Sequence, residues 1–218
     1  MRSPLSCAPL AESEYRVSNT GKLLNGLKQR QSTFGVINLK AAEGTETATF
    51  VQLKLTFMRR GTNQEVVVPR TFMTMYDVDT TLDPVRECQT IKGASRMLLS
   101  ENTELQVYRT YDEKQLPEAK AVFDLMNPVK GEWSEPLVCA TNRGIGADNP
   151  SDGNSLTSLQ RSRSIMSMIE YKSSFHVRLA LSGCCTTGRN YLFGYALWCL
   201  HCSCAGCSCL QLYAHAGN

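Results

Sequence analysis

Four acidic residues, Asp77, Asp79, Asp83 and Glu87, lie within eleven residues of one another. The segment 71–79 leading into them predicts a strand, and because successive side chains of a strand point to opposite faces, Asp77 and Asp79 should leave one face together. An Asp-Pro dipeptide begins at position 83 and predicts a turn, which would bring Asp83 and Glu87 back toward the first two acids. Such carboxylates repel one another unless solvent or a cation lies among them, and Ca²⁺ prefers oxygen ligands. These residues indicate binding rather than bond cleavage.

Two interpretations of the acidic residues remain open. In one, all four bind Ca²⁺, although not as an EF-hand, because Leu82 stands where that loop needs Gly and Cys88 where it needs Glu. In the other, Asp77 and Asp79 form Asx turns at a strand end and bind no ion. The segment Asp148–Asn154 offers further oxygen ligands, but its composition is typical of any long turn.

The cysteines suggest disulfides. Cys88, Cys139, Cys184 and Cys185 flank predicted strands and should include at least one disulfide; we expect the vicinal pair to form two separate bonds, with Cys88 and Cys139 as partners. Disulfides favour an extracellular or cell-surface location, although the N-terminal residues lack the apolar segment of a signal peptide. A catalytic cysteine with His176 as its base is less favoured, because His176 should face solvent and the sequence indicates no acid to orient it.

The last part of the chain is rich in cysteine and poor in charge. Its thiol spacing suits Zn²⁺ or Cu⁺, with two histidines nearby. Residues 191–213 contain no charged side chain over 23 positions, which is long enough to span a bilayer but only weakly hydrophobic. A metal site, a membrane-associated or palmitoylated segment and an unstructured segment all remain open. The residues concerned are Cys199, Cys202, Cys204, Cys207, Cys209, His201 and His215.

Most of the remaining chain has the pattern of short strands. Alternating apolar residues predict strands over 50–57, 71–79, 103–109 and 174–181, and shorter candidates lie at 65–68, 88–91, 96–99 and 133–140. Pro69 should end the 65–68 segment or place it at a sheet edge. A capping box, Thr157 to Gln160, predicts a short helix over 159–166. The residues expected in the core are Val51, Leu53, Leu55, Phe57, Phe175, Val177, Leu179 and Leu181.

This pattern predicts a mainly β fold, an antiparallel, jelly-roll-like β-sandwich with one or two short helices. The expected division is a polar, disordered N-terminal segment over 1–33, the sandwich over 34–193 and the Cys-rich apolar tail over 194–218. The chain of 218 residues, 42% hydrophobic and 20% charged, is long enough for one well-buried domain.

Several blocks together resemble a group of uncharacterised proteins from dinoflagellates and related protists. The resemblance covers roughly residues 34–193 and rests on FVQLKLTF, VVVPRTFMTMYDVDTT, ADNPSDGNSLTSLQRSRSIM and SSFHVRLALSGCCTTGRN. Its most specific parts are the YDVD strand end at 76–79 and the block from Gly183 to Asn190. It implies no settled activity, and only an analogy with extracellular β-sandwich modules.

The net charge of the sequence and the enzyme motifs that it lacks argue against several classes of function. A net charge of +3 with no basic run longer than Arg59-Arg60 argues against a nucleic-acid partner. The sequence contains no P-loop, GxSxG, HExxH or Rossmann motif. We therefore expect a non-enzymatic binding or adhesion module, calcium-dependent in one interpretation, that faces carbohydrate or protein. The alternatives are a structural surface protein without a small ligand and, less favoured, a hydrolase using acidic or Cys residues.

Overall fold

The computed structural model describes residues 26–27, 34–41, 48–59, 61–80, 85–108, 136–182, 188–197 and 210–216. These residues are mostly in strands, with one short helix among them. The elements are β1 (Gly26–Leu27), β2 (Gly35–Leu39), β3 (Ala48–Arg59), β4 (Val68–Tyr76), β5 (Arg86–Lys92), β6 (Arg96–Leu99), β7 (Leu105–Tyr108), β8 (Leu137–Ala140), α2 (Ser158–Ser162), β9 (Ile165–Lys172), β10 (Ser174–Ser182), β11 (Arg189–Leu197) and β12 (Leu210–Ala216).

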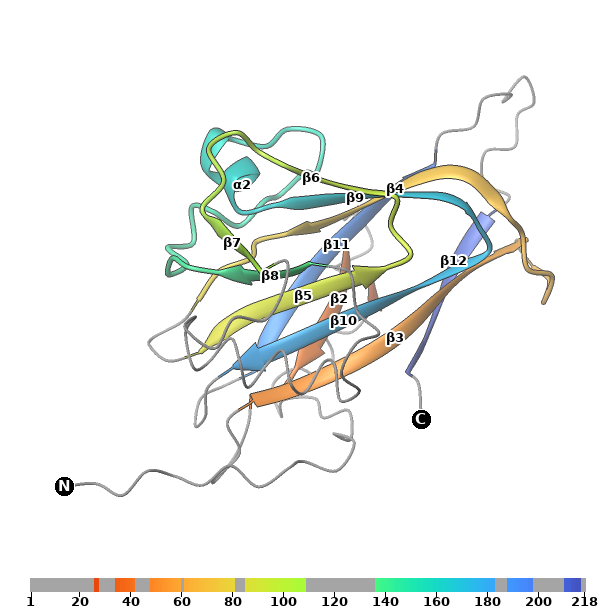
Figure 1. Ribbon diagram of the computed structural model, residues 1–218, viewed down its shortest axis with the longest axis horizontal. Helices are drawn as coiled ribbons and strands as arrows, with labels where there is room; N and C mark the ends of the chain where they lie inside the picture. Colours follow the sequence, from red (N-terminus) through yellow and green to blue (C-terminus); the bar gives the residue numbers. More distant parts are fainter. Residues whose placement is uncertain are drawn as a thin grey trace.

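The strands form two antiparallel sheets packed face to face (Figure 1). One sheet has the order β1-β2-β11-β4-β9-β6 and the other β12-β3-β10-β5-β8-β7. Four pairs are nested within one another along the chain, β2 with β11, β3 with β10, β4 with β9 and β5 with β8, and they alternate between the sheets. A long hairpin rolled up in this way gives a jelly roll, so the predicted fold class is confirmed.

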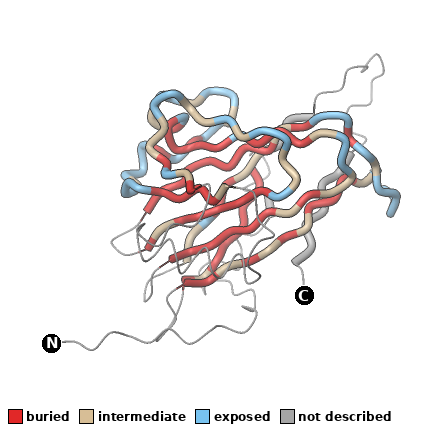
Figure 2. The backbone as a smooth tube through the Cα atoms, viewed as in Figure 1, coloured by how far each residue is buried: buried red, intermediate tan, exposed pale blue. Residues whose placement is uncertain are grey.

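The core lies between the inner faces of the two sheets, as the predicted alternation required. The eight predicted core residues of β3 and β10 are each at most 6% exposed. Leu55 lies opposite Phe175 and Leu53 opposite Val177, so the two strands place their apolar side chains on the same face. Burial of one such side chain contributes about 1.5–3 kcal/mol. Figure 2 shows the buried residues running along the strands, with the exposed ones in the turns.

A disulfide joins Cys88 of β5 to Cys139 of β8, which are directly opposite each other. The prediction of at least one disulfide is therefore confirmed. The expected partners were wrong, because Cys88 and Cys139 bond to each other and leave no thiol for the vicinal pair. Cys184 and Cys185 lie outside the described residues.

The first part of β4 differs from the prediction. Pro69 lies inside the strand, and Glu65 forms only an isolated bridge with Met58. Pairing of β4 with β11 begins at Thr71, so Pro69 lies where β4 has no β11 neighbour. A missing N–H is tolerated there, which explains why a strand can begin before the proline.

The helix is shorter than predicted. Thr157 and Gln160 form the capping box, but α2 ends at Ser162, and the Ser164 hydroxyl donates to the Gln160 carbonyl oxygen. The chain then enters β9, where Ile165 and Ile169 are buried on the inner face. The predicted helix over 159–166 was therefore wrong after Ser162, because pairing with β4 and burial of Ile165 and Ile169 determine the conformation from Ile165 onward.

Both predicted domain boundaries fall within or beside strands. β11 continues past the expected end at 193 to Leu197, and β12 pairs with β3 through Leu212 opposite Phe57. At the other end, β1 lies inside the segment 1–33 and pairs with β2. The cysteines from 199 to 209 and His201 lie outside the described residues. Among the helical residues that the structure describes, no segment is long and apolar enough to cross a membrane.

Candidate functional site

The candidate site begins where the chain leaves β4. The strand ends at Tyr76, and Asp77 has a φ of 58°. Few residues other than Gly adopt this left-handed conformation, and Asp is one that tolerates it. The strand predicted over 71–79 was therefore wrong after Tyr76, and Asp77 and Asp79 do not leave a strand face together.

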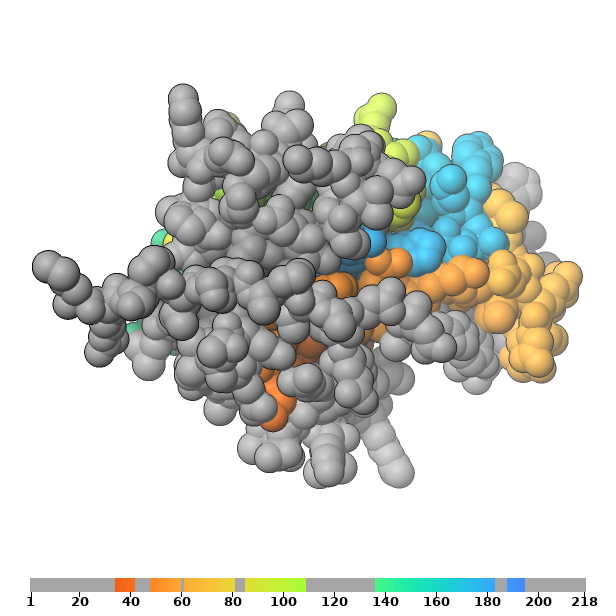
Figure 3. Space-filling view, turned by 60° about the horizontal axis from the view of Figure 1, so that its bottom comes forward, coloured from red at the N-terminus to blue at the C-terminus, as the bar shows by residue number. Residues whose placement is uncertain are grey.

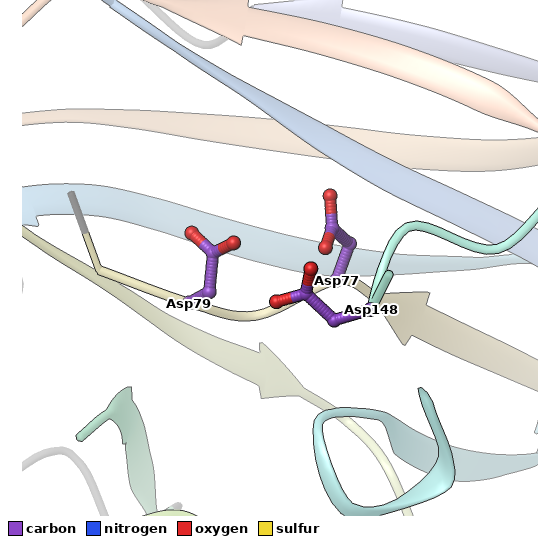
Figure 4. Close-up of side chains that lie close together, drawn as sticks. All are labelled: Asp77, Asp79 and Asp148. Atoms are coloured by element: carbon purple, nitrogen blue, oxygen red, sulfur yellow. The ribbon is translucent and has the colours of Figure 1, made fainter. Parts of the chain in front are cut away.

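Asp77 and Asp79 nevertheless lie close together, and a third carboxylate joins them. One side-chain oxygen from each of Asp77, Asp79 and Asp148 lies within 4.8 Å of the others, and all three residues are buried. Figure 4 shows the three side chains gathered where the chain leaves β4, with Asp148 reaching in from the segment before α2. The Asp148–Asn154 segment thus supplies an acidic side chain to the site.

Backbone contacts hold the residues just before this segment against the chain that leaves β4. The Thr80 N–H donates to the Asn142 carbonyl oxygen at 2.9 Å, and the Gly144 N–H donates to the Thr80 carbonyl oxygen at 2.9 Å. The Ile145 N–H donates to Asp148 Oδ1 at 3.1 Å, which closes a small turn. The position of Asp148 is therefore determined by the backbone as well as by its charge.

Arg163 neutralises Asp148 inside the protein. Its guanidinium pairs with the Asp148 carboxylate and, at 2.8 Å, with Glu104, while Nη1 also donates to the Arg143 carbonyl oxygen at 3.0 Å. The Arg163 side chain is 6% exposed and that of Asp148 is not exposed at all. Hydrogen bonds from Asn142 and then from Arg163 lower the pKa of Glu104. The pairing therefore supplies the partner that a buried charge requires.

Arg189, at the start of β11, forms ion pairs with two acidic residues. Its guanidinium pairs with Asp79, and its Nε donates to Glu87 Oε1 at 2.6 Å. Glu87 belongs to β5, so this contact bridges the two sheets. Burial lowers the pKa of Arg189, and the nearby Asp77 carboxylate opposes that shift.

Glu87 is a buried carboxyl group on the inner face of its sheet. Burial first, and the charge of Asp77 second, raise its pKa well above the ordinary value. Its Oε2 has no hydrogen-bond partner among the described residues. Because Asp79 and Glu87 share one guanidinium, a proton on Glu87 leaves the Arg189–Asp79 pair intact.

A pocket of about 440 Å³ opens at this end of the sandwich. Every residue that lines it is charged, polar or glycine, so hydrogen-bonding groups surround its contents. The Asn149 side-chain amide also lies against Asp77 and, with its nitrogen turned toward the carboxylate, donates to Oδ1 at 2.8 Å. The lining residues are Asp77, Asp79, Thr80, Arg143, Gly144, Gly146, Asn149, Gly188, Arg189 and Asn190.

The structure brings together only some of the predicted site residues. It brings Asp77 and Asp79 together, puts Glu87 in a strand behind them rather than in the predicted turn, and leaves Asp83 outside the described residues. His176 lies on the outer face of β10, between the buried Phe175 and Val177, as its alternation predicted.

The arginines of the site, and Glu104, were not recognised in the sequence as members of the site. Arg163 lies one residue beyond α2, Glu104 precedes β7, and Arg189 lies at the end of the block from Gly183 to Asn190. Only Arg189 carried a signal, because it belongs to a specific block of the resemblance.

Comparison with protein-family models, curated protein sequences and solved structures gives no match to this chain, so the resemblance to the protist group stays a prediction and the site is interpreted from its own geometry.

Proposed function

We propose that the protein is a non-enzymatic binding module whose polar pocket holds a neutral, hydroxyl-rich ligand, with a saccharide as the favoured class. The observation that carries this proposal is the composition of the pocket wall. Carboxylates, guanidinium groups, amides and a hydroxyl line a space of about 440 Å³, which lies in the range of small-molecule sites. Groups of this kind both donate to and accept from sugar hydroxyls.

The charges of the wall favour a neutral ligand over an ion. Asp77 and Asp79 contribute two negative charges, and Arg143 and Arg189 contribute two positive charges. Asp79 is already paired with Arg189. A ligand with a strong net charge would therefore be repelled by the side chains of the same sign, whereas hydroxyl groups can form hydrogen bonds with charges of either sign.

A saccharide partner would agree with an extracellular setting. The Cys88–Cys139 disulfide is typical of proteins from oxidising compartments. The proposed location is therefore outside the cell or on its surface, where carbohydrate ligands are available to a binding or adhesion module. A structural surface protein without a small ligand is the alternative to this proposal.

Calcium is a second candidate ligand because three carboxylates supply oxygen atoms within 4.8 Å of one another. The ion would be held by Asp77, Asp79 and Asp148, with Glu87 behind them and Asp83 as a member proposed from the sequence. The pairs of Asp79 with Arg189 and of Asp148 with Arg163 weaken this case, since they already offset much of the repulsion.

A hydrolase is the least favoured function. A general acid needs a carboxyl group that reaches the substrate in its protonated form. Glu87 is the group whose pKa is raised, yet it is only 1% exposed and lies behind Arg189. The pocket carboxylates are better suited to accepting hydrogen bonds.

The test of the saccharide proposal is saturation-transfer NMR with a panel of neutral mono- and oligosaccharides. Arg143→Ala should reduce the signal of any bound sugar and leave the melting temperature unchanged, because the Arg143 side chain is exposed. Arg96→Ala, an exposed arginine on β6, is the matched control and should bind as the wild type does. A panel without a bound sugar, or signals that Arg143→Ala leaves intact, would overturn the proposal.

The calcium proposal is tested by thermal melts with millimolar Ca²⁺, with EDTA and with neither. If the ion binds, Ca²⁺ raises the melting temperature. At a hundredfold excess over Kd, the free energy of unfolding rises by about 2.7 kcal/mol. Asp77→Asn combined with Asp79→Asn should abolish that rise. A wild-type melt that is the same in Ca²⁺ and in EDTA would exclude calcium as a ligand.

A further inference from the structure

Two large apolar side chains are exposed at one end of the sandwich. Tyr171, in the last turn of β9, is 76% exposed, and Val67, just before β4, is 60% exposed. Backbone hydrogen bonds join the two turns that carry them. The Val66 N–H donates to the Phe57 carbonyl oxygen at 2.9 Å, and the Phe57 N–H donates to the Ser173 carbonyl oxygen at 2.8 Å. The two apolar residues therefore lie in neighbouring turns.

Two cationic residues accompany them. Arg59 ends β3, Lys172 directly follows Tyr171, and both are exposed. Among the residues that the structure describes, neither forms an ion pair with a carboxylate. We call Val67, Tyr171, Arg59 and Lys172 the tip. Figure 3 shows residues of the segment 61–70, in gold, beside residues of β9 and β10, in light blue, at one end of the surface.

The acidic residues of these turns do not cancel the charge of the tip. Glu170 pairs with Arg70 at 2.7 Å, so these two charges offset each other. Glu65 accepts a hydrogen bond from the Ser173 hydroxyl at 3.0 Å and contributes one negative charge against the two positive charges of Arg59 and Lys172. The described residues at this end therefore have a net positive charge.

The backbone of Tyr171 is strained. Its φ of 51° lies in the left-handed region, which is uncommon for a bulky residue and costs free energy. Such strain persists only where the surrounding structure determines it, and it often marks a functional position. The fold thus holds a tyrosine in solvent at a position where Gly or Asn would be less strained.

The tip lies at the opposite end of the sandwich from the pocket. β4 begins one residue after Val67 and ends at Tyr76, directly before the pocket residue Asp77. Its 9 extended residues span about 27 Å. A surface bound at the tip would leave the pocket open at the far end.

The strand register brings an uncharged part of the sequence to the same end. β11 ends at Leu197, opposite Thr71, and β12 begins at Leu210, opposite Arg59. The sequence between these strands, 198–209, contains no Asp, Glu, Lys or Arg. A lipid surface at the tip would therefore meet no such charge from this part of the chain.

We propose that the tip binds the surface of a lipid bilayer that carries anionic headgroups. A tyrosine suits this boundary because its ring is apolar and its hydroxyl can stay hydrated. Val67 would enter the same layer, and Arg59 and Lys172 would lie among the headgroups. A protein partner is less favoured, because two apolar side chains make a much smaller patch than a stable interface of about 1,200 Å². This inference does not depend on the saccharide proposed for the pocket, because the two sites share no residue.

The test is co-sedimentation of the full chain with vesicles of mixed phosphatidylcholine and phosphatidylglycerol. Val67→Ser with Tyr171→Asn should weaken binding at least about tenfold, because both apolar side chains lose their transfer from water. Asn tolerates a left-handed φ, so the melting temperature should not fall. Val67→Ile with Tyr171→Trp should retain binding. Leu98→Ser with Met166→Thr removes two exposed apolar side chains from β6 and β9 and is the matched control, which should bind as the wild type does.

The cations provide a second readout. Arg59→Gln with Lys172→Gln should weaken binding to the mixed vesicles roughly tenfold and leave the weaker binding to pure phosphatidylcholine vesicles unchanged. Added salt should act in the same direction, because it screens exposed charges. No binding to the mixed vesicles, or an equal loss in the control variant, would overturn the proposal. A dimer in sedimentation velocity without vesicles that Val67→Ser with Tyr171→Asn dissociates would also overturn it, since a second copy would then occupy the tip.

Discussion

The buried pair of Asp148 and Arg163 allows a sharp test of how the site is held together. Asp148→Asn keeps the shape of the side chain and an oxygen that accepts from the Ile145 N–H. It removes the charge that faces Arg163, whose side chain is 6% exposed. Removal of one member of a buried ion pair typically costs about 3–5 kcal/mol, because the remaining charge cannot return to water.

We expect the lower end of that range, about 3 kcal/mol, because Arg163 keeps its second partner, Glu104, which is 31% exposed. For a chain of this length such a loss lowers the melting temperature by roughly 6–12 °C. Urea unfolding at neutral pH measures the free energy directly, and a thermal melt provides the second reading.

Asp152→Asn is the matched control, because Asp152 belongs to the same segment but is exposed. Its cost should stay within about 0.5 kcal/mol. The double variant Asp148→Leu with Arg163→Met removes both charges and should regain much of the loss. If Asp148→Asn unfolds at the same urea concentration as Asp152→Asn, the pair does not stabilise the site and this reasoning is refuted.

Three further predictions follow from single contacts. Gly144→Ala would place a Cβ against the Asp79 carboxylate, so it should destabilise the protein by about 1–3 kcal/mol in urea unfolding, and an unchanged midpoint would contradict the close contact. The pKa of Glu87 is higher in the folded protein than in the unfolded chain, so its contribution to the free energy of unfolding is fully present below about pH 4.5 and is lost as the pH rises through the folded pKa. Glu87→Gln should therefore reduce the fall of the unfolding free energy with rising pH, measured by urea unfolding. Parallel pH curves for the variant and the wild type would contradict this prediction. Reduction of Cys88–Cys139 should cost about 2–4 kcal/mol, and mass spectrometry of the unreduced, alkylated protein should find both cysteines unlabelled.

The parts of the fold that were predictable are those determined by local periodicity. Val51 to Phe57 and Phe175 to Leu181 show a clear alternation because every second side chain is a large apolar one that packs into the core between the sheets. β9 was missed because Ile165, Met166, Met168 and Ile169 follow a capping box and lack a simple alternation. In the structure their strand conformation depends on pairing with β4, which is a contact across nearly a hundred residues.

The site was predictable only where its residues are neighbours in the sequence. Asp77 and Asp79 were recognised together, although for the wrong reason, since the chain turns at Asp77 instead of continuing as a strand. Asp148 and Arg189 come from distant segments, and Arg189 lies 102 residues from Glu87. Such pairings arise from the rolled topology, which brings strand ends together without leaving a local signal.

The pocket glycines allow the most direct test of the central claim that this site binds a sugar. The backbone amide resonances of Gly144, Gly146 and Gly188 can be followed while the wild-type protein is titrated with the saccharide that gives the strongest saturation-transfer signal. The account predicts saturable shifts at these three amides, and unchanged resonances at Gly61 and Gly93, which lie in turns outside the pocket lining. Shifts confined to other residues, or no saturable shift at the three pocket glycines, would contradict it.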